Sequence, residues 1–208
     1  MAAIDIKKTH RELYLAVPRE PTLVKVPSFS YLMVDGKGDP NVSQDFREAI
    51  QTLYGLSYTL KFQLKKEGVE HVVGPLEGLF HAKDPSVFLT GKKKEWEWTL
   101  MILQPKEVTA KRLSAARAEL MKKKKSTTLP DVRLAKLAEG LCAQVLHIGP
   151  YAAEGPTIEG LHSFISEKGC AFAGPHHEIY LSNPGRVAPQ KMKTIIRQPV
   201  RRITRRGS

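Results

Sequence analysis

The order strand, helix, strand, strand occurs twice in the sequence pattern, near residues 22–104 and again near 141–200. In both places short apolar runs bounded by Gly and Pro indicate strands, and one stretch with apolar residues at three- and four-residue steps indicates an amphipathic helix. Two copies of such a unit predict a pseudo-twofold domain rather than a solenoid. We therefore expect an α+β fold in which duplicated βαββ units form a curved antiparallel sheet, with helices on one face and a ligand cleft on the other.

The same patterns give approximate bounds. In the first copy we expect strands at about 22–34, 72–80 and 95–103, and a helix at about 42–66. In the second copy we expect strands at about 141–148, 176–181 and 192–200, and a helix at 157–167. The connector 106–139 is rich in Ala, Lys, Arg, Leu and Glu, so we interpret it as helical. Residues 1–20 are interpreted as a peripheral arm or short helix.

Composition excludes several classes of protein. Apolar residues make up 41% of the 208-residue chain, but no stretch approaches the roughly 18–20 apolar residues of a membrane-spanning helix. The N-terminus lacks a basic-then-apolar signal pattern. Two cysteines, Cys142 and Cys170, do not make a disulfide framework, and no Cys/His spacing is typical of a zinc site. We expect residues 1–208 to form a single cytoplasmic domain with no metal and no membrane partner.

The net charge of +12 raises the question of nucleic-acid binding. The basic residues form three blocks, Lys92–Lys94, Lys122–Lys125 and the arginines at 201–206, with few aromatic residues between them. We interpret these blocks as solvated runs, with a nucleic-acid surface as the alternative. We therefore predict no specific nucleic-acid partner. The sequence leaves open whether the protein is a monomer or a dimer.

The stretch Gly174–Pro184 carries the most distinctive chemistry. It is typical of a short strand closed by an Asn-Pro-Gly turn. Because strand side chains alternate between faces, His176, Glu178 and Tyr180 share one side. A carboxylate at the centre of a strand face is either solvated, and paired with a basic side chain, or meets a ligand in a cavity. Tyr180 has the corresponding alternative of a packing residue with a satisfied hydroxyl. Two adjacent histidines point to opposite sides, so His176 and His177 do not suit a metal pair.

Alternation also places Trp96 and Trp98 on one face of an expected strand. Two tryptophans on one strand face usually belong to the core. The alternative is a wall that stacks against flat or cationic ligands, for which indole faces are well suited.

These residues resemble a known family. The duplicated βαββ pattern, His-Ile-Gly-Pro-Tyr at 147–151, Gly-Pro-His-His-Glu-Ile-Tyr-Leu-Ser-Asn-Pro at 174–184 and the run through 191–200 are similar to GyrI-like small-molecule-binding proteins. The resemblance covers about residues 20–200. It is strongest to the stand-alone branch that includes cyclopropanoid cyclopropyl hydrolases. In the related drug-responsive regulators, a cleft glutamate among aromatic rings binds bulky cationic or flat aromatic molecules, and Glu178 occupies the matching place.

The resemblance implies a hydrolase that opens the cyclopropane of DNA-alkylating natural products with water and needs no cofactor. In that mechanism Glu178 would be the general base, and Tyr180 would hydrogen-bond the water or the developing phenolate. The residues expected to contact the ligand are Tyr151, Trp96, Trp98, Phe80 and His176. The segment Gly78–His81 departs from the family pattern, in which more tryptophan is expected.

Two other functions stay open. One is non-catalytic sequestration of hydrophobic or cationic aromatic drugs. The other is a protein-partner role such as inhibition of DNA gyrase. That role requires either an acidic surface, which the positive net charge disfavours, or an exposed inhibitory loop.

Overall fold

The computed structural model describes residues 3–81 and 96–203, which divide into two compact units. Unit 1 comprises Met1–His10 and Phe29–Leu137, and unit 2 comprises Arg11–Ser28 and Ala138–Ser208. One division falls between His10 and Arg11, and the other two fall within the long strands β1 (Thr22–Lys37) and β4 (Arg133–Ile148). Helices and antiparallel strands are present in both units, so the predicted α+β class is confirmed.

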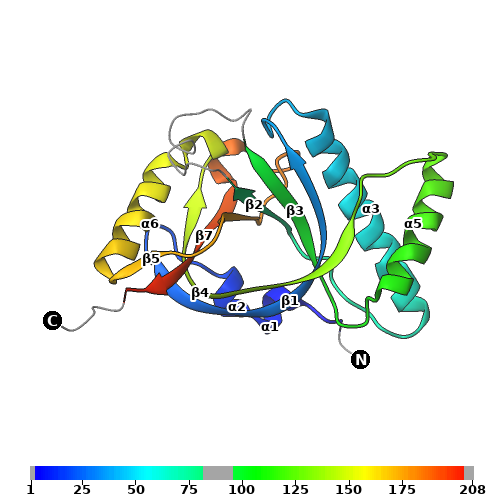
Figure 1. Ribbon diagram of the computed structural model, residues 1–208, viewed down its shortest axis with the longest axis horizontal. Coiled ribbons are helices and arrows are strands. Elements are labelled where there is room, and N and C mark those ends of the chain that lie inside the picture. Colours follow the sequence, from blue (N-terminus) through cyan, green and yellow to red (C-terminus); the bar gives the residue numbers. More distant parts are fainter. Residues whose placement is uncertain (1–2, 82–95, 204–208) are drawn as a thin grey trace. The chain divides into compact units, whose positions relative to one another are not determined.

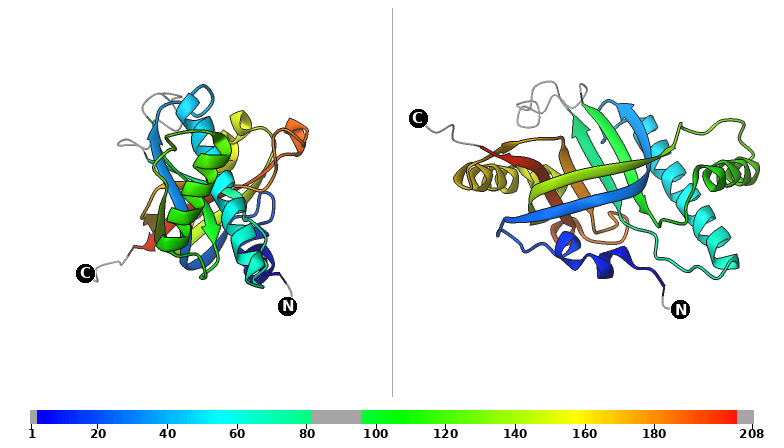
Figure 2. Two further views of the ribbon diagram at one scale, coloured as in Figure 1. Left: turned by 90° about the vertical axis from the view of Figure 1, so that its right-hand side faces the viewer. Right: turned by 60° about the horizontal axis from the view of Figure 1, so that its bottom comes forward.

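In unit 1, the second half of β1 pairs with β3 (Glu97–Gln104), and β3 pairs with β2 (Leu76–His81), all antiparallel. Helix α3 (Gln44–Lys66) begins at Ser43, whose side chain accepts a hydrogen bond from the backbone of Phe46. Its leucines are buried, and Ser57 bonds the Gln104 side chain of β3 at 3.1 Å. Helix α5 (Ala110–Lys124) lies beside α3 (Figures 1 and 2). The short helix α1 (Ile6–Thr9) also belongs to this unit.

In unit 2, β4 pairs with β7 (Lys193–Arg202), which also pairs with β6 (His176–Tyr180) and β5 (Cys170–Phe172). Helix α6 (Gly155–Glu167) packs Leu161 and Ile165 against Val145 of β4 and Ile196 of β7. The 3-10 helix η2 (Tyr151–Ala153) leads directly into α6, and η3 (Pro189–Lys191) leads into β7. The short helix α2 (Arg11–Tyr14) completes the unit (Figure 1).

The two units pair their strands in the same order. In each, the first strand pairs with the last, and the last pairs with the middle one. A Gly-Pro dipeptide precedes the middle strand in both, at 74–75 and 174–175. By this correspondence Gly78 of β2 stands at the place of Glu178 of β6, and Phe80 stands at the place of Tyr180.

Two expectations from the sequence were wrong. Within the connector 106–139, α5 covers only residues 110–124, and β4 begins at Arg133. The composition there favours helix, but Ala135 and Leu137 alternate in strand fashion onto the core of unit 1, and burial outweighs helix propensity. The arm 1–20 is not peripheral throughout, because Leu13 and Tyr14 are almost fully buried. The predicted strand at 95–103 begins at Glu97, and Glu95 lies outside the described residues.

A close contact in unit 1 gives a testable prediction. The indole of Trp98 lies over Gly36, and a Cβ added there would fall 2.0 Å from it. Trp98 is buried and also packs edge-on against Phe46 of α3, with ring centroids 5.0 Å apart, so it has little room to move. We expect Gly36→Ala to destabilise the protein by about 1–3 kcal/mol, measured by urea unfolding. Gly160→Ala, at a helical position with no atom near the added Cβ, is the control and should not destabilise; equal losses would contradict the prediction.

Candidate functional site

Strand β6 places His176, Glu178 and Tyr180 on one face. Glu178 pairs with Ile196 of β7, and Tyr180 pairs with Thr194. Paired residues on adjacent strands share a face. Ile196 packs under α6, so Glu178 and Tyr180 lie on the face of unit 2 that α6 covers. This differs from the expectation that helices and the site lie on opposite faces of the sheet.

Glu178 is the centre of a buried polar cluster. The residue as a whole is 8% exposed. Its Oε1 lies 3.3 Å from Nε2 of His176. The hydroxyl of Tyr180 donates a hydrogen bond to the same carboxylate. Burial, together with the charge of Glu178, raises the pKa of Tyr180 well above its usual value. Tyr180 is therefore a neutral hydrogen-bond donor, and Glu178 is a carboxylate held between an imidazole and a phenol.

The segment before α6 covers one side of this cluster. The ring of Tyr151 in η2 meets the ring of Tyr180 edge-on, with centroids 5.5 Å apart. Tyr151 is 37% exposed, so the tyrosine pair reaches from the buried carboxylate to solvent. Glu154, the next residue after η2, is buried, and its charge also raises the pKa of Tyr180. The sequence analysis missed Glu154, although an acid just before Gly155-Pro156 marks a helix start.

His147 of β4 forms hydrogen bonds with the same segment. Its Nε2 lies 3.3 Å from the carbonyl of Pro150, and its Nδ1 lies 2.9 Å from the hydroxyl of Thr157. A carbonyl only accepts, so Nε2 carries the proton and the hydroxyl of Thr157 donates to Nδ1. These two bonds hold the turn that carries Tyr151 against the sheet.

The aromatic residues of unit 1 that were predicted to contact a ligand make two ring contacts. Phe80 and Trp96 contact each other edge-on, with centroids 5.5 Å apart. Trp98 is 2% exposed and packs on Phe46, which matches the core alternative. A role for Trp96 as a ligand contact stays a prediction.

The opposite face of β6 carries a second buried network that the sequence analysis did not find. Glu139 accepts from His177 at 2.9 Å and from Arg197 at 3.3 Å. Arg197 also donates to Gln144 at 3.1 Å and to the carbonyl of Leu13 at 2.8 Å. Burial alone would raise the pKa of Glu139, but His177 and Arg197 lower it to about 2. This network connects α2 with β4, β6 and β7 in unit 2.

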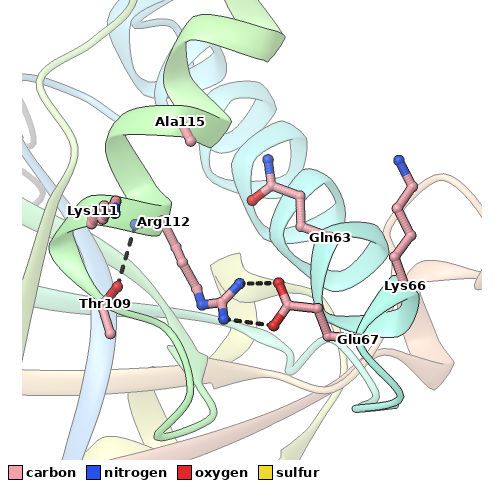
Figure 3. A pocket seen from close by; sticks show the side chains of 7 residues that line it. All are labelled: Gln63, Lys66, Glu67, Thr109, Lys111, Arg112 and Ala115. Atoms are coloured by element: carbon pink, nitrogen blue, oxygen red, sulfur yellow. Dashed lines mark hydrogen bonds and ion pairs between the residues drawn. The ribbon is translucent and has the colours of Figure 1, made fainter.

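A separate hollow of about 570 Å³ lies in unit 1, where α3 ends and α5 begins (Figure 3). Arg112 of α5 and Glu67 of α3 face each other across it with two bonds of 2.6 and 2.7 Å. None of the predicted site residues lines it, and most of the residues that do line it are exposed, so it is not the small-molecule site expected from the sequence.

The described residues contain neither a cluster of metal ligands nor a membrane-spanning helix. Across 3–81 and 96–203, no three His, Cys, Asp or Glu side chains gather as they would around a metal ion. In the same residues no helix combines the length and apolarity needed to cross a membrane.

Thr194, beside Tyr180, gives a second prediction. Its side chain is fully buried, and its hydroxyl has no hydrogen-bond partner among the described residues. An unsatisfied buried hydroxyl costs about 1–3 kcal/mol, so Thr194→Val should raise the free energy of unfolding by about 1 kcal/mol. Thr157→Val is the matched control, because it removes the hydroxyl that bonds His147 and should lower stability. A loss of stability in Thr194→Val would contradict the prediction; both are measured by urea unfolding.

The chain is similar to a known protein family and to several solved structures. The sequence matches the family described as GyrI-like small molecule binding domain over residues 19–201. A crystal structure of an uncharacterized conserved protein from Listeria innocua is 37% identical, with a TM-score of 0.87, covering 95% of this chain and all of the other. Two crystal structures of hydrolases from Listeria innocua are 34% and 36% identical, with TM-scores of 0.85 and 0.82; they cover 96% and 95% of this chain and all of their own. None of the curated proteins searched matches the sequence.

Proposed function

Because the chain belongs to the GyrI-like small-molecule-binding family, as its motif at 174–184 predicted, we propose that the polar face of β6 binds a flat aromatic or cationic small molecule and adds water to it. One observation carries the proposal: a buried carboxylate, Glu178, is held between His176 and the neutral phenol of Tyr180, next to the partly exposed ring of Tyr151. Such a group costs free energy to bury, and proteins place such groups where chemistry or a charged ligand needs them.

The likeness to the two hydrolases from Listeria innocua supports the catalytic part of the proposal. We propose a cyclopropane conjugated to a dienone as the substrate group. Glu178 takes one proton from water while the water oxygen bonds to the ring carbon. The carbon–carbon bond breaks, and its electron pair moves to the distant carbonyl oxygen, which becomes a phenolate. That oxygen then receives a proton, so the net change is the addition of one water.

Each residue of the proposed site has its own role in this reaction. Glu178 is the general base, a role that contributes about 10²–10⁴-fold. Tyr180 stays protonated because its pKa is raised, so it can donate a hydrogen bond but cannot itself be the base. Tyr151 offers a ring edge to a flat ligand, and His176 orients the carboxylate. In unit 1, Phe80 and Trp98 are both 2% exposed, and we assign both to the core of that unit.

The test is to incubate the protein with a cyclopropapyrroloindole-type alkylator and follow the product by mass. The proposal expects the mass of one added water to appear faster than in buffer alone. Heat-denatured protein is the control for adventitious nucleophiles. Covalent attachment of the alkylator to the protein, or a rate no faster than buffer, would contradict the hydrolase proposal.

A binding protein without catalysis is the second candidate. It is favoured by the carboxylate of Glu178 beside aromatic rings, an arrangement that attracts delocalised cations. It predicts saturable binding of a cationic aromatic dye, with the dye recovered unchanged. Equilibrium dialysis of the dye against the protein and against Glu178→Gln measures this, and equal affinity of both proteins would contradict it.

A further inference from the structure

The outer face of α5 carries exposed lysines at both of its ends. Helical spacing places one stripe of exposed residues opposite the buried stripe of Leu113, Ala116 and Leu120, which packs on α3. The exposed stripe has lysines at its two ends and only small residues between them. Its members are Lys111, Ser114, Ala115, Ala118, Lys122 and Lys125. The left view of Figure 2 looks onto this helix beside α3.

The charge of the chain is concentrated here. The segment from Ala110 to the C-cap Lys125 contains seven Lys and Arg residues and one acid, Glu119. Its net charge is therefore +6 over 16 residues, compared with +12 for the whole chain. The two arginines of α5 are engaged, Arg112 with Glu67 and Arg117 with Asp131. Among the described residues, Lys111, Lys122 and Lys125 make no ion pair, so their charge faces outward.

The spacing of these charges suits a polyanion with two rows of phosphates. Lys111 and Lys122 are eleven residues apart, which is about 17 Å along the helix at 1.5 Å per residue. The major groove of a nucleic-acid duplex is about 12 Å wide and has a phosphate strand on each edge, so a helix that crosses it can place a lysine at about 17 Å separation over each of the two edges. Ser and Ala between the lysines leave room for a duplex to approach the helix closely. We propose that the outer face of α5 binds the phosphate backbone of duplex DNA without reading its sequence.

A lipid surface fits this face less well. Helices that lie on membranes insert large apolar side chains below their lysines. The outer stripe of α5 offers only Ser114, Ala115 and Ala118 between its charges. This proposal changes the interpretation of one of the three basic blocks, Lys122–Lys125, and does not depend on the chemistry at Glu178.

The experiment measures anisotropy of a labelled duplex of about 20 base pairs between roughly 50 and 200 mM salt. The wild-type protein should bind with an affinity that falls linearly on a log–log plot against salt. The triple variant Lys111→Gln, Lys122→Gln, Lys125→Gln should bind at least about tenfold more weakly at low salt, with a slope shallower by about 2.7, since each of the three lost phosphate contacts removes roughly 0.9. Ala118→Glu, which leaves every lysine in place, should also weaken binding.

The matched control is Lys7→Gln, Lys8→Gln, Lys25→Gln, which removes the same charge from exposed positions outside α5. It should bind the duplex within about twofold of the wild type. The proposal is overturned if both triple variants weaken binding equally, because net charge alone would then explain it. It is also overturned if the wild type does not bind the duplex, or binds vesicles of anionic lipid at the same ionic strength while leaving the duplex unbound.

Discussion

Glu178→Gln is expected to lower the rate of water addition by about 10²–10⁴-fold and to leave ligand binding largely intact. Glutamine has the shape of glutamate, so its carbonyl oxygen can still accept from Tyr180 and His176, whose bonds fix the side chain of Glu178. What glutamine cannot do is take a proton from water. The measurement is the initial rate of product formation by mass, with ligand affinity determined separately by equilibrium dialysis.

Two further variants test whether the loss of rate is specific to the carboxylate of Glu178. Glu159→Gln removes a carboxylate from the exposed side of α6 and should leave the rate unchanged. Tyr180→Phe removes the hydrogen bond to the carboxylate but not the base, so it should lower the rate less than Glu178→Gln does. Equal rates in Glu178→Gln and wild type would exclude Glu178 as the base. A parallel loss of binding and rate would make it a ligand contact instead.

The polar face of β6 could be predicted because it depends only on local backbone geometry. Side chains of a strand alternate whatever surrounds the strand, so His176, Glu178 and Tyr180 had to share a side once the strand was identified. Helix α3 was predictable for the same reason, since its apolar residues from Phe46 to Leu64 repeat at helical spacing over about five turns. The family followed from the same stretch of sequence.

Features that depend on distant partners could not be predicted. The first half of β4 has the composition of a helix, and only burial of Ala135 and Leu137 in unit 1 makes it a strand. Glu139 lies 38 residues from His177 and 58 from Arg197, so no local pattern links the three. The place of α6 over the same face as Glu178 follows from the register of β4, β7 and β6, which the sequence pattern does not specify.

Glu139→Gln is expected to reduce the free energy of unfolding at neutral pH by about 3–5 kcal/mol. The side chain of Glu139 is almost fully buried; it forms an ion pair with Arg197 and a hydrogen bond with His177, which are buried too. Glutamine keeps an acceptor for one of them but removes the carboxylate charge that faces the buried guanidinium of Arg197. Urea unfolding of the two proteins at pH 7 measures the difference, with exposed Glu159→Gln as a control that should stay within about 0.5 kcal/mol of wild type.

The pH dependence separates this charge effect from a simple packing defect. The pKa of Glu139 falls from an ordinary value of 4.5 to about 2 in the folded protein, so the unfolded chain binds its proton more readily than the native state does. The resulting stabilisation, about 3 kcal/mol, is present in full above pH 4.5 and is lost as the pH falls toward 2. Glu139→Gln has no such proton to bind, so its difference from wild type should shrink over that interval. A difference that stays constant from pH 5 to pH 2.5 would show that the loss comes from packing and that the carboxylate charge does not stabilise the fold.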